Sequence, residues 1–250
     1  MAECGSNSDG SLWIKAENQP SSSEIFSSLP MDPTFSKMNV NTRWALTDVF
    51  LIHIAKFNLW IMPSRNTANE LKKTIMSVRK DRPHSPTSYP DFEPHITLAS
   101  IQLETPLALS TIKNAIPKTQ HAFLVKFKSV EVGDHYFRSV YISIVLDETL
   151  KNLRQSVHET LGVCSTTPQY PHISLVYISD EDDNNVVRER ERYYDELRER
   201  QLIRDHDDDS GGIKLRTESG WLEGSMMTEI WVVKCVGPVE TWEVLDKTLL

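Results

Sequence analysis

Cysteine is scarce in this 250-residue sequence, which contains only Cys4, Cys164 and Cys235. Three thiols that lie far apart argue against a secreted disulfide scaffold and against a clustered thiolate metal site. A chain of this length buries roughly 70% of its unfolded surface, so its core needs no disulfide or metal to hold it together. We therefore expect a reducing compartment. The sequence leaves open whether Cys164 or Cys235 is disulfide-bonded.

Long hydrophobic runs are also absent. The first thirty residues lack a basic start followed by an apolar stretch, so we expect no secretory signal peptide. The most apolar window, residues 44–62, is interrupted by Asp48, His53 and Lys56, which makes it a poor transmembrane candidate. The sequence therefore predicts no membrane span.

Positive charge is in short supply, because 27 lysines and arginines face 35 acidic residues and the formal net charge is −8. Such a chain, without basic runs, is unsuited to binding duplex nucleic acid or an anionic membrane nonspecifically. The acidic excess is concentrated in residues 180–209, which hold 13 acids and 6 bases. The remainder is almost neutral and has room for a locally positive phosphate pocket.

Several catalytic motifs are missing as well. The sequence has no glycine-rich phosphate loop, no His-Glu-x-x-His helix, no Cys-x-x-Cys pair and no Gly-x-Ser-x-Gly elbow. Kinase, zinc-protease and serine-hydrolase functions are therefore not indicated. The composition, with 39% hydrophobic and 25% charged residues, is that of an ordinary globular protein.

The first part of the chain differs in composition from the rest. Residues 1–43 contain nine serines and three prolines but few large aliphatic side chains, too little apolar area to offset the entropy of ordering. We expect residues 1–56 to form a disordered or poorly ordered extension. The folded domain is expected to span residues 57–250.

Within that domain, hydrophobic patterning and helix caps predict alternating strands and helices. Thr67 and Glu70 form a capping box that opens one helix, and Gly162 closes another. The acidic segment 184–203 is interpreted as a long helix with a mainly solvated face. The expected strands are 57–62, 94–101, 121–130, 139–146, 171–178 and 228–236, and further helices are 107–116 and 150–161.

Two similar pentapeptides lie 77 residues apart, PHITL at 94–98 and PHISL at 171–175. The order of elements by itself is compatible with a doubly wound sheet. The repeated pentapeptide favours a duplicated unit instead.

The polar residues of each pentapeptide are two positions apart. In a strand, side chains alternate between faces, so His95 and Thr97 share one face while the aliphatic residues point to the other. His172 and Ser174 are arranged in the same way. If the two strands lie side by side, two imidazoles and two hydroxyls face the same space.

Such a set of side chains suits hydrolysis of a phosphodiester. One neutral imidazole can take a proton from water, and the other, as imidazolium, can give a proton to the departing ribose oxygen. The two hydroxyls can donate to nonbridging phosphoryl oxygens. This scheme requires no metal and no cofactor.

The motifs and their surroundings resemble the two-histidine phosphoesterase superfamily and, within it, the cyclic nucleotide phosphodiesterases of fungi and plants. The resemblance covers about residues 57–250. It includes the segments LWIMP (59–63), FEPHITL (92–98), residues 133–142, CSTTP (164–168), PHISLVY (171–177) and VETW (239–242). It implies a two-lobed, pseudo-symmetric α+β fold, with antiparallel sheets and flanking helices around a central cleft, in place of a doubly wound sheet.

The resemblance also implies an activity. It is hydrolysis of nucleoside 2',3'-cyclic phosphates to 2'-phosphates, and of ADP-ribose 1'',2''-cyclic phosphate, a tRNA-splicing by-product, to ADP-ribose 1''-phosphate. His95 and His172 would be the acid and base, and the near-symmetric pair leaves their assignment open. Thr97 and Ser174 would donate to phosphate, and Tyr177 would contact the substrate.

Two aromatic residues, Tyr177 and Trp60, can each be placed in more than one way. Strand alternation places Tyr177 on the opposite face from His172 unless the strand ends or bulges first. Trp60 either flanks the substrate base or belongs to the core.

Other readings remain open at this point. An RNA 2',3'-ligase or RNA 3'-end phosphodiesterase of the same superfamily is one, although an acidic protein without basic runs fits a polymer less well. A module that binds a cyclic phosphate without turning it over is another. We expect a monomer that acts on a small cyclic nucleotide, in the cytoplasm or, as in fungal members of the family, associated with the Golgi.

Overall fold

The computed structural model describes residues 3–6, 12–15, 55–80, 85, 87–103, 109–163, 170–179, 186–206 and 211–250. The chain divides into two units, Met1–Ile54 and Ala55–Leu250. In the first unit, β1 (Glu3–Ser6) and β2 (Leu12–Lys15) pair as antiparallel strands. The remainder of this unit, on which most of the expected N-terminal extension falls, lies outside the described residues.

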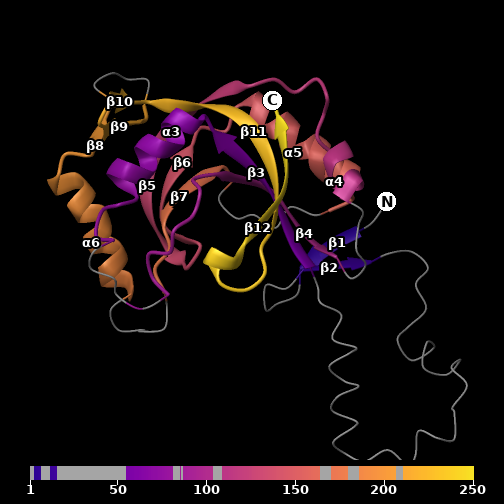
Figure 1. The fold of residues 1–250 in the computed structure, drawn as a ribbon, viewed down its shortest axis with the longest axis horizontal. Coiled ribbons are helices and arrows are strands. Elements are labelled where there is room, and N and C mark those ends of the chain that lie inside the picture. Colours follow the sequence, from indigo (N-terminus) through magenta and orange to yellow (C-terminus); the bar gives the residue numbers. More distant parts are fainter. Residues whose placement is uncertain are drawn as a thin grey trace, which may run out of the picture. The chain divides into compact units, whose positions relative to one another are not determined.

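The second unit is built on one seven-stranded antiparallel sheet in the order β12-β11-β3-β4-β7-β6-β5 (Figure 1). β4 and β7 meet at a single residue pair, so the sheet has two halves joined by a narrow seam. β11 also pairs with β5 through residues 224–227. The strands are β3 (Ala55–Pro63), β4 (Ile96–Leu103), β5 (Phe123–His135), β6 (Arg138–Ile144), β7 (His172–Val176), β11 (Gly224–Lys234) and β12 (Glu243–Leu249).

Helices cover this sheet from outside, with α5 against β4 and α6 against β5 and β6 (Figure 1). The α+β class with antiparallel strands is therefore as expected, although the two halves belong to one sheet. The remaining elements are α3 (Arg65–Glu70), the π-helix η2 (Leu71–Ile75), α4 (Leu109–Asn114), α5 (Glu148–Leu161), α6 (Val186–Glu199), the three-stranded sheet of β8 (Ile203–Asp205), β9 (Ile213–Thr217) and β10 (Gly220–Leu222), and the 3₁₀-helix η3 (Val239–Thr241).

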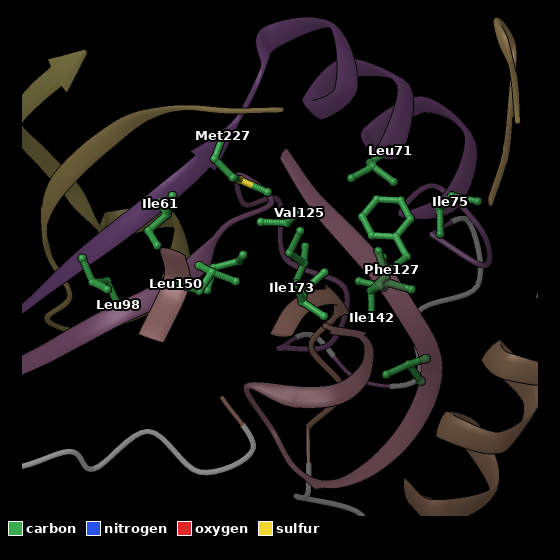
Figure 2. Packing of buried hydrophobic residues seen from close by; sticks show 14 of the residues in the cluster. Ile61, Leu71, Ile75, Leu98, Val125, Phe127, Ile142, Leu150, Ile173 and Met227 are labelled. Carbon is green, nitrogen blue, oxygen red and sulfur yellow. The ribbon is translucent and has the colours of Figure 1, made fainter. Parts of the chain in front are cut away.

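The hydrophobic core lies between the sheet and its helices. Figure 2 shows Ile142 and Ile173 of neighbouring strands packed near Phe127, with Leu71 and Ile75 of η2 close by. The alternation expected in β5 is present, because its apolar positions 125 and 127 are buried while positions 124, 126 and 128 are exposed. Burial of this one face fixes the register of the strands.

Helix boundaries agree with the caps only in part. Gly162 ends α5 in the left-handed conformation, with φ 62°, as its position predicts. The first helix begins earlier than expected, because Ser64, not Thr67, is the N-cap. The Ser64 hydroxyl accepts a hydrogen bond from the Thr67 backbone N–H at 3.3 Å. A serine directly after Pro63 offers the same three-residue capping spacing one turn upstream.

The acidic helix α6 is not merely a solvated face. Tyr193 and Leu197 are fully buried, and Glu189 is buried as well. The Arg79 guanidinium donates to both carboxylate oxygens of Glu189 at 2.9 and 3.1 Å, and the Tyr89 hydroxyl donates to the same carboxylate at 2.6 Å. This ion pair compensates for the burial of the two charges and ties α6 to the segment before the first motif.

The end of the chain was incompletely predicted. The strand expected over 228–236 is present as β11, but it is not the last, since β12 follows it. β12 is half exposed at the sheet edge and has little hydrophobic alternation, so its sequence gives a weak strand signal. In the part of the chain that the structure describes, no helix is long and apolar enough to cross a membrane.

Candidate active site

The two histidine motifs lie side by side at the seam of the sheet. Ile96 of β4 is paired with Ile173 of β7 in antiparallel register, and both side chains are buried in the core. Because side chains alternate, the residues on either side of these isoleucines share the opposite face. The same register sets position 95 opposite 174 and position 97 opposite 172. The structure thus brings the four predicted side chains of His95, Thr97, His172 and Ser174 to one face.

The two motifs also share a local irregularity. In β4 the register with β3 skips Leu98, and in β7 the register with β6 skips Leu175. Each leucine is the fifth residue of its pentapeptide, and each is buried in the core. A one-residue bulge at the same place in both motifs supports the pseudo-symmetry that the duplicated sequence predicts.

The bulge at Leu175 decides the position of Tyr177. One extra residue reverses the alternation, and Tyr177 follows the last residue of β7, so it lies on the side of Ser174. Burial raises the pKa of Tyr177 far above its ordinary value. The Phe92 ring stacks on it with centroids 4.0 Å apart. Tyr177 is therefore a fixed, neutral phenol beside the motif face.

His95 is the more enclosed of the two histidines, with 7% of its surface exposed. Its Nδ1–H donates to the Glu93 carbonyl oxygen at 2.6 Å, which leaves Nε2 as the acceptor. Burial lowers the pKa of His95 to about 3. The hydrogen bond to Glu93 raises this pKa and the charge of His172 lowers it, both by less than burial does. His95 is therefore neutral near pH 7.

The depressed pKa of His95 predicts how stability depends on pH. In the unfolded chain His95 is protonated below about pH 6.5, whereas in the folded protein it stays neutral down to about pH 3. The free energy of unfolding is therefore highest above pH 6.5 and decreases as the pH falls below it. We expect protonation of His95 in the unfolded chain to lower the free energy of unfolding by about 2 kcal/mol when the pH falls from 6.5 to 5. Urea unfolding of the wild type and of His95→Asn at both pH values measures the difference. Equal losses in the two proteins would contradict it.

His172 stands in a more open setting and has its own aromatic neighbour. It is half-buried, and the Tyr141 ring meets it edge-on with centroids 5.3 Å apart. The Tyr141 hydroxyl donates to Glu131 at 2.8 Å, and burial followed by this bond raises the pKa of Tyr141. Tyr141 is the cross-strand partner of Ser174. The sequence analysis missed both Tyr141 and Glu131, although their alternate positions in the strands placed them on this face.

The two motif hydroxyls are in different states. Ser174 Oγ donates to the Phe137 carbonyl oxygen at 2.7 Å, so its proton is already engaged with the turn between β5 and β6. The half-buried Thr97 hydroxyl has no hydrogen-bond partner among the described residues. Thr97 is ready to donate to a ligand, whereas Ser174 must first leave Phe137.

Candidate metal ligands and thiols also bear on what the site can do. Within the described residues, no group of three or more histidine, cysteine and acidic side chains is placed to hold a metal ion. Cys235 is a free, buried thiol whose pKa is raised to about 12 by burial, and it accepts a hydrogen bond from Asn58 Nδ2 at 3.2 Å. The Cys164 side chain lies outside the described residues.

Comparison with known proteins places these features in context. The sequence profile of a family described as "Cyclic phosphodiesterase-like protein" matches residues 56–250. A protein named 2',3'-cyclic-nucleotide 3'-phosphodiesterase from Kluyveromyces lactis is 26% identical over 217 residues, covering 76% of this chain and 96% of that protein. A protein of the same name from Yarrowia lipolytica is also 26% identical, covering 75% of this chain and 96% of its own.

More distant similarities are found in Arabidopsis thaliana and among solved structures. A protein named cyclic phosphodiesterase from Arabidopsis thaliana is 24% identical over 133 residues, covering 52% of this chain and 70% of that protein. The crystal structure of E. coli LigT complexed with 3'-AMP is 14% identical, covers 79% of this chain and 99% of its own, and has a TM-score of 0.46.

Proposed function

Because this chain belongs to the cyclic phosphodiesterase-like protein family, we propose that it hydrolyses nucleoside 2',3'-cyclic phosphates to nucleoside 2'-phosphates. ADP-ribose 1'',2''-cyclic phosphate, the tRNA-splicing by-product, is the second proposed substrate and ADP-ribose 1''-phosphate its product. The names of the yeast relatives support cyclic phosphodiester hydrolysis. The observation that carries the proposal is the register of β4 and β7, which sets two imidazoles and two hydroxyls on one face.

The two histidines differ enough in burial and hydrogen bonding for one to be assigned as the base and the other as the acid. His95 is neutral, its Nδ1–H is engaged with Glu93 and its Nε2 is an acceptor, so it takes the proton from the attacking water. The more open His172 gives a proton to the departing 3'-oxygen. An acid at position 95 would have to be an imidazolium before the reaction begins, in a buried setting that disfavours its charge, whereas a base there carries the proton only transiently. The reverse assignment is therefore the less favourable one.

The remaining site residues bind the phosphate. Thr97 donates its hydroxyl to a nonbridging oxygen, and Ser174 does the same after its proton leaves the Phe137 carbonyl. Tyr177, neutral and on the side of Ser174, contacts the substrate from that side. The scheme uses no metal, because acid, base and anion donors are all side chains of the chain itself.

The metal-free scheme gives a direct test of the function. We expect the purified protein to convert 2',3'-cyclic AMP to 2'-AMP at the same rate with and without EDTA, because no step draws on a cation. Chromatography of the products against 2'-AMP and 3'-AMP standards measures both rate and regiochemistry. A protein that binds the substrate tightly but releases no product would instead be a binding module, and loss of turnover in EDTA would refute the scheme.

The proposal also covers the preferred substrate class, the oligomeric state and the cellular location of the protein. A small cyclic nucleotide is preferred to an RNA end because the chain has a net charge of −8 and no basic runs. We propose a monomer located in the cytoplasm or associated with the Golgi. The ratio of kcat/KM for 2',3'-cyclic AMP to that for an oligonucleotide ending in a 2',3'-cyclic phosphate distinguishes the two substrate classes.

A further inference from the structure

Trp60 lies directly against the more enclosed histidine of the site. It belongs to β3, exposes 4% of its surface, and is the cross-strand partner of Thr97. Its ring is stacked on the His95 imidazole, with centroids 3.7 Å apart and planes 12° from parallel. Two flat rings at this separation and angle are in direct contact, so the position of the indole restricts the plane of the imidazole.

The indole Nε1–H of Trp60 has no hydrogen-bond partner among the described residues, although it is buried. Leaving such a donor unsatisfied is energetically costly, and more than 90% of buried polar groups have a partner. The two tryptophans near Trp60 have partners for their indole N–H groups. Trp231 donates its Nε1–H to Glu229 at 2.6 Å, and Trp242 donates to the Gly237 carbonyl oxygen at 3.2 Å.

We propose that Trp60 donates its Nε1–H to an anionic phosphoryl oxygen of the bound substrate, and that its stacked ring fixes the plane of the His95 imidazole. This inference rests on the proposed function and adds a third donor to the two motif hydroxyls. In this structure Nε1 is closed to solvent, so the anion reaches it only as neighbouring side chains shift on binding, and the bond then satisfies a donor that is otherwise unmet. Such a bond to a charged oxygen is stronger than one between neutral groups.

The unsatisfied Nε1–H of Trp60 also has a purely structural explanation, which the experiment must distinguish from substrate binding. Asn58 lies two residues earlier on the same face of β3, and its buried Oδ1 also has no partner within the segments that the structure describes. A water molecule joining Trp60 Nε1 to Asn58 Oδ1 would satisfy both atoms. In that case the Nε1–H would serve stability alone, and ligand would not change its environment.

The conservative variant Trp60→Phe keeps a stacking ring and removes only the N–H and part of the ring. We expect kcat/KM to fall about tenfold or more, the effect of losing a hydrogen bond worth about 1.4 kcal/mol. The thermal unfolding temperature should stay level or rise, because an unsatisfied donor is removed. In the matched control Trp231→Phe, the lost N–H already has a partner in Glu229, so we expect lower stability with unchanged kcat/KM.

A second measurement uses the wild-type protein and does not depend on the variant folding. Of the six tryptophans, the Trp60 Nε1–H signal is identified by its contacts with the His95 ring protons in a ¹H–¹⁵N NMR spectrum. On titration with 2'-AMP, we expect this proton to move downfield as it becomes hydrogen-bonded, while the signal of Trp231 stays in place. An unmoved Trp60 signal at saturation would overturn the inference.

The outcome also separates this inference from the proposed function. If His95→Ala is inactive while Trp60→Phe retains wild-type kcat/KM, the role of the indole is wrong and the function stands. If His95→Ala keeps full activity, the proposed function itself fails.

Discussion

Replacing either motif histidine by alanine is expected to lower kcat/KM for 2',3'-cyclic AMP by about 100-fold or more. The physical reason is that each imidazole carries one of the two proton transfers, and removing a positioned acid or base costs about 10²–10⁴-fold. His95→Ala and His172→Ala should each show the full loss. The double variant should be little worse than either single one, because the two residues act in one step.

The activity assay requires a control variant and a stated outcome that would contradict the prediction. His121 is exposed and precedes β5, away from the motif strands, so His121→Ala should keep wild-type kcat/KM. Circular dichroism of each variant checks that the fold is intact. Losses below tenfold in both His95→Ala and His172→Ala would show that these imidazoles do not carry the chemistry.

Thr97→Ala and Ser174→Ala are expected to have the next largest effects, and the two should differ. A hydroxyl that donates to a charged oxygen in a partly dry site is worth about 1–3 kcal/mol, or about 5- to 150-fold in kcat/KM. Thr97 has no competing partner in the part of the chain that the structure describes, so its removal should cost the whole of this contribution. Ser174 gives up a 2.7 Å bond to the Phe137 carbonyl oxygen when it turns to phosphate, which offsets part of its contribution.

Two comparisons make this prediction decisive. Thr97→Ser and Ser174→Thr keep the hydroxyl and should recover most of the lost activity. Ser174→Ala should also unfold at a lower temperature than Thr97→Ala, because only Ser174 is bonded to the turn at Phe137. If Ser174→Ala costs more activity than Thr97→Ala while stability is equal, the assignment of the two hydroxyls is wrong.

The elements that the sequence predicted well are those with a strong local signal. The stripe of α5 and the glycine at its end gave that helix, and strict alternation gave β5. The cap of α3 was misplaced because Ser64 and Thr67 offer similar local signals, and only the course of the chain after β3 chooses between them. The buried Glu189 of α6 was unexpected, since its partner Arg79 lies 110 residues away.

The same division applies to the candidate site. The two pentapeptides name His95, Thr97, His172 and Ser174, because period-two spacing already sorts polar from apolar side chains in any strand. The sequence could not show that Tyr177 joins them, since that depends on a bulge visible only in the pairing of β6 and β7. Nor could it separate the histidines, which look alike in sequence and differ in burial.

By itself, the sequence therefore determined the residue types of the site, their faces in each strand and the duplication that pairs them. Tertiary structure alone decided the state of each group, because a pKa, a tautomer and an unsatisfied donor depend on which distant segments exclude water. His95 is neutral, and Trp60 Nε1 has no partner among the described residues, because both side chains are buried in the folded chain.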